Sequence, residues 1–394
     1  MLRAPRDSHA RANPSPPVVS DAPLRLARIT AHPLRVVLPK AQRTSQGDYP
    51  AVEILVVEVE TEDGLVGWGE GLARRGAKAY AGFVDDVLAP RLLGCDARDR
   101  RALWRTMRAA LSGRPGGQLV EAIAAIDIAL WDLAGKAAGQ PIHRLLGGMG
   151  RREVAAYASS INWLDDATVE AEVASALSAG FREIKVKLGQ PVDAAIARAA
   201  LVRRLAGDRI ALYADANWAY DVDDALRVGR ALADLGYGFF EEPIVPQDRA
   251  GYARLAHHLP IRLAAGESDY VASEALDLLA DRSIGLIQPD VTRVGGITET
   301  WRIAELAAIH HTAYAPHVGW SGAICVAASL QLAAAAETFR TFECMVYANP
   351  LRESLVRPSV GEAHALTDGR LSVPDGPGLG VDIDRDVLAA HRIG

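Results

Sequence analysis

The chain has 394 residues, 49% of them apolar, with a formal net charge of −6 and a pI near 6.0. This length allows two domains or one barrel with additions, and the apolar content can fill a sizeable core without disulfides. The acidic balance, without a long Lys/Arg run, argues against a nucleic acid or an anionic membrane as partner and favours a small-molecule substrate.

The N-terminus and the cysteines bear on where the protein works. Residues 1–22 have no apolar segment of the secretory type, so we expect a disordered leader or a start codon assigned too far upstream. Cys95, Cys325 and Cys344 are odd in number and lack metal-site spacing, which favours packing roles in a reducing, cytoplasmic compartment. The most apolar run, residues 323–336, is too short to span a bilayer.

Residues 23–148 are predicted to form an α+β domain. Strand-like alternation runs from Leu24 to about Gly71, with Glu62-Asp63-Gly64 as a hairpin turn. Between Tyr80 and Gly147 the period becomes helical, and the strongest apolar stripe covers residues 119–131.

Residues 149–356 read as a parallel barrel of alternating strands and helices, because short strands are separated by Ala/Leu/Arg-rich helical segments. Eight strands are predicted, which matches a closed (β/α)8 barrel. They cover Val154–Ala158, Glu183–Lys187, Ile210–Ala214, Tyr237–Glu241, Ile261–Ala265, Ile284–Gln288, Thr312–Ala315 and Thr341–Cys344. The Pro/Gly-rich residues 357–394 are expected to pack back on the first domain.

Polar residues recur along the barrel at nearly constant intervals. Lys187, Asp215, Glu241, Glu267, Asp290 and His317 are separated by 28, 26, 26, 23 and 27 residues, and Glu343 follows after another 26. One strand and helix unit uses about that much chain, so the period indicates one functional side chain at the same end of each strand. A closed barrel would gather all seven at one mouth.

Three of these residues suit a metal ion. Asp215, Glu241 and Glu267 end successive strands, and three carboxylates converging from separate strands suit Mg²⁺. The alternative for any one of them is a helix N-cap, although the equal spacing favours the metal. The residues alone do not decide between Glu241 and Glu242.

The other members of the set suit proton transfer. Lys185 and Lys187 point to the same side of their strand, which we expect to be the barrel interior rather than a solvated face. Two close, desolvated ammonium groups would favour a neutral amine and hence a base. His317 and Asp290 end adjacent strands and suit an acid/base pair. The alternative for His317 is a structural role in which its ring only makes hydrogen bonds. Glu343 could donate to a substrate carboxylate if its pKa is raised, or form a structural ion pair.

The ordered motifs resemble the enolase superfamily, mandelate racemase subgroup, over about residues 24–390. They are Lys-x-Lys (185–187), Asp-Ala-Asn (215–217), Phe-Glu-Glu-Pro (240–243), Gly-Glu (266–267), Gln-Pro-Asp-x-x-x-x-Gly-Gly (288–296) and Pro-His-Val (316–318). The resemblance implies a capping α+β domain over a modified TIM barrel. It also implies one Mg²⁺ on Asp215, Glu241 and Glu267, and removal of the proton next to a carboxylate. Lys187 and the His317/Asp290 pair would be bases on opposite faces, with Lys185 at the carboxylate oxygens.

Two opposed bases permit dehydration, lactone cycloisomerisation or racemisation. Dehydration of a sugar acid to a 2-keto-3-deoxy acid is favoured, because polar residues are predicted at the mouth. Arg43, Asn162, Trp163 and Asn217 are candidates for substrate binding, each with a surface-loop role as the alternative. Similarity to galactarolactone cycloisomerases around Glu70, Asn349 and residues 374–380 makes a lactone isomerase the second choice, ahead of a racemase or epimerase. The family also implies a homo-oligomer, from dimer to octamer.

Other classes fit less well. Gly319-Trp-Ser-Gly-Ala323 resembles a nucleophile elbow but has Ala323 where the second glycine belongs and no following Asp-then-His set. Neither GxGxxG nor a Walker lysine occurs, which disfavours a nucleotide enzyme. A non-catalytic binding barrel would have no use for the paired bases.

Overall fold

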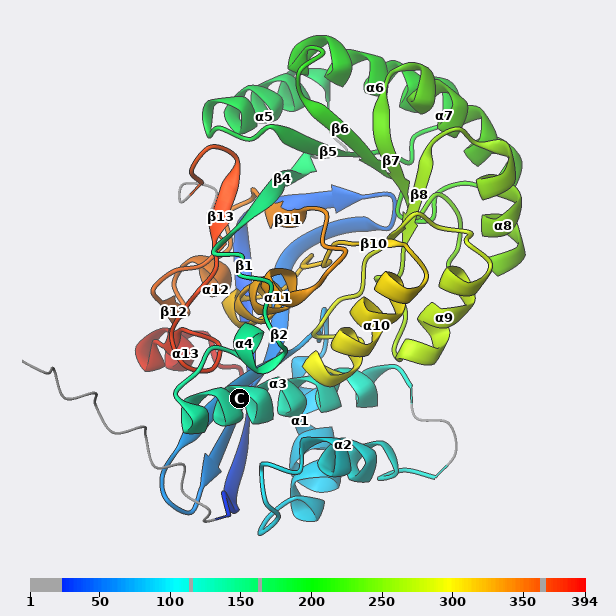
Figure 1. Ribbon diagram of the computed structural model, residues 1–394. Helices are drawn as coiled ribbons and strands as arrows, with labels where there is room; N and C mark the ends of the chain where they lie inside the picture. Colours follow the sequence, from blue (N-terminus) through cyan, green and yellow to red (C-terminus); the bar gives the residue numbers. More distant parts are fainter. Residues whose placement is uncertain (1–22, 113–115, 162–164, 362–365) are drawn as a thin grey trace, which may run out of the picture.

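The computed structural model describes residues 23–112, 116–161, 165–361 and 366–394. Figure 1 shows a ring of strands and helices above a smaller α+β region, with the long strands β1 and β2 running between them. The predicted leader, residues 1–22, lies outside the described residues. Among the described helices, none combines the length and the apolar character needed to cross a membrane.

The N-terminal region is built on a three-stranded antiparallel sheet in the order β1-β2-β3. The strands are β1 (Leu26–Thr44), β2 (Gly47–Thr61) and β3 (Val66–Gly71). The helices are α1 (Ala77–Gly82), the π-helix η1 (Phe83–Leu88), the 3-10 helix η2 (Ala89–Arg91), α2 (Arg100–Arg108), α3 (Gln118–Ala138) and α4 (Ile142–Leu145). The predicted hairpin turn at residues 62–64 joins β2 to β3, and the main helical stripe is present as α3. Strands β1 and β2 form a second, longer hairpin that turns after Thr44.

Helix α3 lies unusually close to strand β3, and alternate glycines explain why. A Cβ atom on Gly69 would lie 1.8 Å from the carbonyl oxygen of Ala125, and one on Gly67 would lie 2.3 Å from that of Ala129. The apolar stripe of α3 is buried against this sheet. This contact holds the sheet against α3. The β1–β2 hairpin projects from the same sheet toward the barrel.

The barrel contains eight parallel strands in the order β10-β9-β8-β7-β6-β5-β4-β11. An isolated parallel bridge between Tyr314 and Phe339 links β10 to the segment before β11, which closes the ring at its base. The strands are β4 (Glu153–Ile161), β5 (Glu183–Lys187), β6 (Ala211–Asp215), β7 (Tyr237–Glu241), β8 (Arg262–Ala265), β9 (Leu286–Ile287), β10 (Ala313–Tyr314) and β11 (Phe342–Met345). The prediction of a modified TIM barrel with an N-terminal α+β domain is confirmed.

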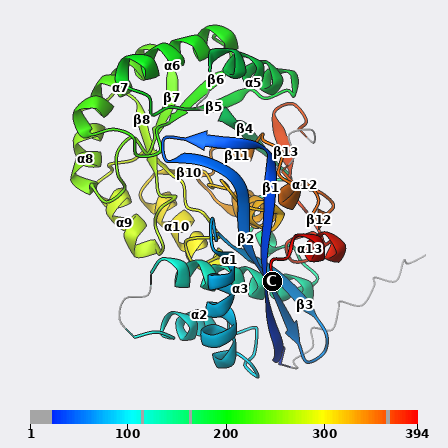
Figure 2. The ribbon, with the colours of Figure 1, turned by 180° about the vertical axis from the view of Figure 1, so that it is seen from behind.

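Helices surround this ring on the outside, as Figures 1 and 2 show for α5 to α10. They are α5 (Asp166–Ser178), α6 (Val192–Ala206), α7 (Val222–Asp234), α8 (Arg249–His258), α9 (Ala272–Ala280), α10 (Ile297–Ile309) and α11 (Ala323–Ala335). Inside the ring, Tyr157, Tyr213, Phe239, Ala264, Leu286 and Ala315 form a separate buried cluster. This apolar floor lies next to Lys185, whose Nζ atom is 5.2 Å from the ring centroid of Tyr157.

The C-terminal tail contacts both parts of the molecule. It contains α12 (Pro350–Glu353), β12 (Val356–Arg357), β13 (Arg370–Ser372), β14 (Asp382–Ile383) and α13 (Arg385–His391). Strand β13 pairs antiparallel with β4 of the barrel, whereas Arg385 donates to Glu58 of β2. The predicted boundaries at residues 148 and 356 stay predictions, and the tail lies against the barrel as well as the first domain.

Candidate active site

Strand register brings the first functional residues together at one end of the barrel. Lys187 of β5 pairs with Asp215 of β6, which in turn pairs with Glu241 of β7. Side chains at neighbouring register positions of a parallel sheet point to the same face. Asp290 and His317 are likewise joined by a parallel bridge just after β9 and β10. The polar residues that recur at regular intervals in the sequence therefore lie together at the mouth of the barrel.

The three predicted metal ligands form one buried cluster. Asp215, Glu241 and Glu267 each offer a carboxylate oxygen, and these oxygens lie within 4.8 Å of one another. Ligand oxygens around a Mg²⁺ ion lie about 3 to 4 Å apart, because each is about 2.1 Å from the ion. Across the described residues, Glu267 Oε2 is buried without a hydrogen bond, and its contact with His317 is an ion pair. Glu242 turns instead toward the indole nitrogen of Trp218.

The charge state of this cluster also suits a cation. Burial and the nearby Asp215 raise the pKa of Glu241 to about 8. Burial acts in the same direction on Asp215, but Lys187 and Lys185 outweigh it and hold its pKa below the ordinary value. Buried carboxylates this close repel one another when both are ionised, and a divalent cation relieves that repulsion.

Lys185 is fully buried and surrounded by acids. Its Nζ atom lies 2.8 Å from both carboxylate oxygens of Glu241, 2.8 Å from Glu343 Oε1 and 3.7 Å from Asp215 Oδ2. Burial acts to lower the pKa of Lys185, but the carboxylates of Glu241 and Glu343 raise it well above the ordinary value. Its ammonium group therefore stays charged.

The pKa of Lys187 differs from the one expected for the lysine pair. It is buried, and its Nζ atom donates to Asp215 Oδ2. Burial acts to lower its pKa, yet the attraction of Asp215 raises it above the ordinary value. The expected net lowering of the lysine pKa is wrong for this arrangement: Lys185 does act to lower the pKa of Lys187, but the carboxylate of Asp215 outweighs this effect.

Glu343 does not meet the condition for a proton donor, which was a raised pKa. Its Oε1 atom accepts from Ser159 Oγ at 2.7 Å and from Lys185, and its Oε2 atom accepts from the backbone N–H of Val318 at 2.9 Å. Burial acts to raise its pKa, but Lys185 and His317 lower it well below the ordinary value. The structural ion pair weighed as the alternative is what the structure shows.

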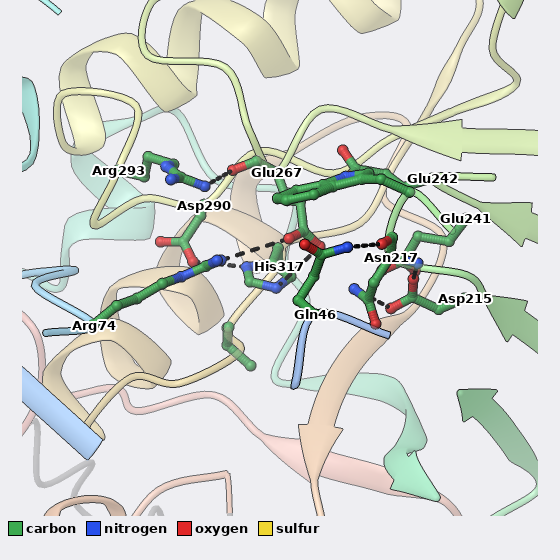
Figure 3. Close-up of polar contacts among 12 residues, drawn as sticks. Gln46, Arg74, Asp215, Asn217, Glu241, Glu242, Glu267, Asp290, Arg293 and His317 are labelled. Carbon is green, nitrogen blue, oxygen red and sulfur yellow. Dashed lines mark hydrogen bonds and ion pairs between the residues drawn. The ribbon is translucent and has the colours of Figure 1, made fainter. Parts of the chain in front are cut away.

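His317 and Asp290 form the expected pair. His317 Nδ1 lies 2.7 Å from Asp290 Oδ2, and its Nε2 atom faces Glu267 Oε2 at 3.2 Å. Burial acts to lower the pKa of His317, but Glu267, Glu343 and Asp290 raise it to about 9. Asp290 is held in turn by the backbone N–H of Thr292 at 2.8 Å. Figure 3 shows His317 between Asp290 and Glu267.

The pocket above these groups has aromatic as well as polar walls. Its described lining is Thr44, Gln46, Tyr49, Arg74, Ser160, Lys187, Asn217, Trp218, Glu267, His317, Gly319, Trp320, Glu343 and Met345. Thr44, Gln46 and Tyr49 come from the tip of the β1–β2 hairpin, residues 42–49, which we call the lid. Figure 2 shows this hairpin reaching the end of the barrel strands.

The lid is held to the barrel at two places. Ser45 Oγ donates to the carbonyl oxygen of Asn217 at 2.7 Å, and Gln46 Nε2 donates to the same oxygen at 2.7 Å. On the other side, the ring of Tyr49 stacks on Trp320 with a centroid distance of 4.3 Å. The pocket is therefore covered, and the lid supplies part of its wall.

The predicted substrate-binding residues have different positions. Asn217 lines the pocket, and its Oδ1 atom is buried without a hydrogen-bond partner in the described part of the chain. Arg43 lies on the lid with about half of its side chain exposed, 3.5 Å from Asp48, and it is not part of the described pocket wall. Asn162 and Trp163 lie outside the described residues.

Several wall residues were not predicted from the sequence, notably Arg74, Tyr49 and Trp320. Arg74 belongs to the N-terminal region and follows β3, far in sequence from the periodic barrel residues. Arg74 and Trp320 both have a positive φ, of 36° and 64°, which is uncommon outside glycine. No short motif marks such residues, since only the packing of the two regions brings them to the mouth.

Comparison with known proteins agrees with this architecture. Residues 168–387 match the family described as enolase C-terminal domain-like. Residues 27–147 match the N-terminal domain of mandelate racemase and muconate lactonizing enzyme. A capping domain above a barrel with converging acids defines the enolase superfamily. The chain belongs to its mandelate racemase/muconate lactonizing enzyme family.

Individual relatives cover most of the chain. It is 35% identical to D-galactarolactone cycloisomerase of Agrobacterium fabrum over 86% of this chain and 91% of the relative. It is 34% identical to arabinonate dehydratase of Saccharolobus solfataricus, with the same coverage. The crystal structure of a racemase from Streptomyces coelicolor with bound magnesium is 31% identical, covers 93% of this chain and 100% of its own, and superposes with a TM-score of 0.86.

Proposed function

We propose that this protein is a Mg²⁺-dependent acid-sugar dehydratase. It would remove the α-proton of an aldarate or aldonate and expel the β-hydroxyl group to form a 2-keto-3-deoxy acid. The observation that carries the proposal is the three-carboxylate cluster between two proton-transfer groups, Lys187 beside Asp215 and His317 beside Glu267. Relatives named as dehydratases and cycloisomerases support the reaction class.

The proposed metal ligands are Asp215, Glu241 and Glu267, because they offer hard oxygen atoms at nearly the required separations. Bound Mg²⁺ would supply positive charge to the carboxylate oxygens of the substrate as the enediolate develops. Lys185 would add to it, since its buried ammonium group lies in the same cluster. The α-proton of a carboxylate is very weakly acidic, so charge already in place is what makes its removal feasible.

The proton steps follow from the two flanking groups. Lys187 is proposed to take the α-proton as a neutral amine, which requires that its ammonium group, now hydrogen-bonded to Asp215, first release a proton to solvent. His317, which Asp290 orients through Nδ1 and which Glu267, Glu343 and Asp290 together keep protonated, would then donate to the departing β-hydroxyl group, which leaves as water. The C–H and C–O bonds break, a C=C bond forms, and the resulting enol becomes the 2-keto acid.

A lactone cycloisomerase is the second candidate. It is favoured by the 35% identity to the galactarolactone enzyme and needs the same bases. The aromatic surfaces of Trp218 and Trp320 in the pocket suit a sugar ring as well as an open chain. The cytoplasmic location and the homo-oligomer expected from the sequence stay predictions.

The proposed function is tested by incubating the purified chain with a panel of aldonates, aldarates and their lactones in the presence of Mg²⁺. We expect a 2-keto product, detected as its semicarbazone, and no product after treatment with EDTA until Mg²⁺ is restored. Lactone consumption without keto product would support the cycloisomerase instead. Failure of every acid and lactone to react, or to exchange its α-hydrogen in D₂O, would contradict both.

A further inference from the structure

Arg74 brings a positive charge from the N-terminal region into the reaction pocket. It lies between β3 and α1 and lines the same pocket as Lys187 and His317. Its backbone has a φ of 36°, in the left-handed region that a non-glycine residue adopts at a cost in free energy. Such strain persists only where the surrounding structure imposes it. Here it aims the guanidinium group at the pocket, as Figure 3 shows.

The described residues do not satisfy the hydrogen-bonding capacity of this guanidinium group. Its Nε and Nη2 atoms are buried and have no hydrogen-bond partner within the described part of the chain. Glu267 Oε1 lies 3.6 Å from Nη2, which is an ion pair but too long for a hydrogen bond. A cation bound at the carboxylate cluster would further reduce the attraction that Glu267 exerts on Arg74. The guanidinium group of Arg74 is therefore suited to bind an anion other than Glu267.

Arg293 shows the contrast, because it approaches the same glutamate from another side. Its Nε atom donates to Glu121 Oε1 at 3.2 Å, its Nη1 atom donates to the carbonyl oxygen of Glu267 at 3.3 Å, and Nη2 donates to Tyr270 Oη at 3.4 Å. Arg293 is thus a structural link between the two regions. Arg74 has no comparable set of partners among the residues that the structure describes, although both arginines are drawn beside Glu267 in Figure 3.

We propose that Arg74 binds a second carboxylate on the substrate, and hence that the substrate is an aldarate rather than an aldonate. The inference rests on the proposed function, in which the reacting carboxylate lies at the metal cluster. The planar fork of the guanidinium N–H groups matches a carboxylate with two parallel hydrogen bonds. Asn217 Oδ1 lies in the same pocket, has no hydrogen-bond partner among the described residues, and can accept from an intervening hydroxyl group.

The test compares hexarates with the hexonates of matching stereochemistry, which differ only in having CH₂OH in place of the distal carboxylate. We expect the Mg²⁺-loaded wild-type chain to prefer the hexarate. Arg74→Met should lower kcat/KM for the hexarate by roughly 10- to 100-fold, the effect of losing a charged hydrogen-bonded pair. For the hexonate the change should stay within about threefold, and Arg74→Lys should restore part of the preference.

Arg75→Met is the matched control. Arg75 is the next residue, lies over the ring of Tyr49 at 5.9 Å, and is not part of the described pocket wall. It should leave the hexarate preference unchanged. A second readout, independent of turnover, is the affinity of each acid for the inactive Lys187→Met chain with Mg²⁺, measured by calorimetry. Arg74→Met in that background should weaken hexarate binding selectively.

A wild-type chain that prefers hexonates would overturn the inference and leave the proposed function standing. Equal losses for both acids, together with weaker Mg²⁺ binding, would also overturn it, because Arg74 would then act by holding Glu267. Absence of turnover with every acid sugar would refute the proposed reaction. The binding comparison would still decide on Arg74, since selective binding of dicarboxylates supports the inference and equal binding opposes it.

Discussion

Replacing Asp127 by Asn should change how the stability of the protein depends on pH. Asp127 lies on α3 and is fully buried. Its Oδ2 atom accepts from the backbone N–H of Thr298 at 2.9 Å, and its Oδ1 atom accepts from Thr298 Oγ at 2.6 Å, in the first turn of α10. A Cβ atom on Gly296 would lie 2.4 Å from Oδ2, so the glycine of the Gly-Gly motif makes room for this contact.

The expected magnitude follows from the pKa of Asp127. Burial raises it from 3.8 to about 7, although the hydrogen bonds from Thr298 act in the opposite direction. An acid whose pKa is raised on folding contributes stability below its unfolded pKa, and this contribution is lost as the pH rises through the folded value. At 1.36 kcal/mol per pKa unit, the wild type should lose about 2 to 3 kcal/mol from this residue between pH 5 and pH 8.

The measurement is the thermal unfolding midpoint at several pH values, at one protein concentration. Asp127→Asn keeps the shape of the side chain but cannot ionise, so its midpoint should rise relative to the wild type as the pH rises from 5 to 8. Glu170→Gln, at an exposed position of α5, serves as the control and should follow the wild type.

A constant offset between Asp127→Asn and the wild type across this pH range would refute the reasoning. It would mean that Asp127 ionises in the folded protein as easily as in the unfolded chain, so that burial at the contact between α3 and α10 does not control its charge.

Three further predictions concern the active site. Lys187→Met should lower kcat by about 10²- to 10⁴-fold while Mg²⁺ binding, measured by calorimetry, persists; full activity would contradict its role as a base. Asp290→Asn removes the partner that lies 2.7 Å from His317, and should abolish most dehydration while Lys187 still exchanges the α-hydrogen in D₂O. NMR of the substrate would detect this exchange, and its parallel loss would argue that His317 removes the proton. Tyr49→Ala removes the stack on Trp320 and should raise KM by roughly 3- to 30-fold with a smaller change in kcat, because the lid closes less firmly. An unchanged KM in steady-state kinetics would show that this contact does not hold the lid.

The barrel could be predicted because its signals are local and repeated. Each strand segment carries its own apolar pattern, and the nearly constant interval between polar residues reports one unit per repeat. The ends of the strands were less predictable. Strands β9 and β10 have two residues each, shorter than the predicted segments at 284–288 and 312–315, because ladder pairing depends on neighbouring strands rather than on local composition.

The charge states could not be read from the same pattern. Two lysines at alternate positions predict a shared face, which is what β5 shows, but the pKa of each depends on what lies opposite it. Lys185 has Glu241 and Glu343 within 2.8 Å, so attraction to these acids prevails over burial. These contacts join residues 56 and 158 positions apart in the chain.

The barrel, and the order and type of its polar residues, could be read from the amino-acid order alone, because period and motif are properties of residues close together in the chain. Which groups surround the pocket depends instead on contacts between residues far apart in the chain. Arg74, Tyr49 and Trp320 meet there because a hairpin and a loop of the N-terminal region reach the barrel mouth, and such packing depends on the whole surface buried between the two parts.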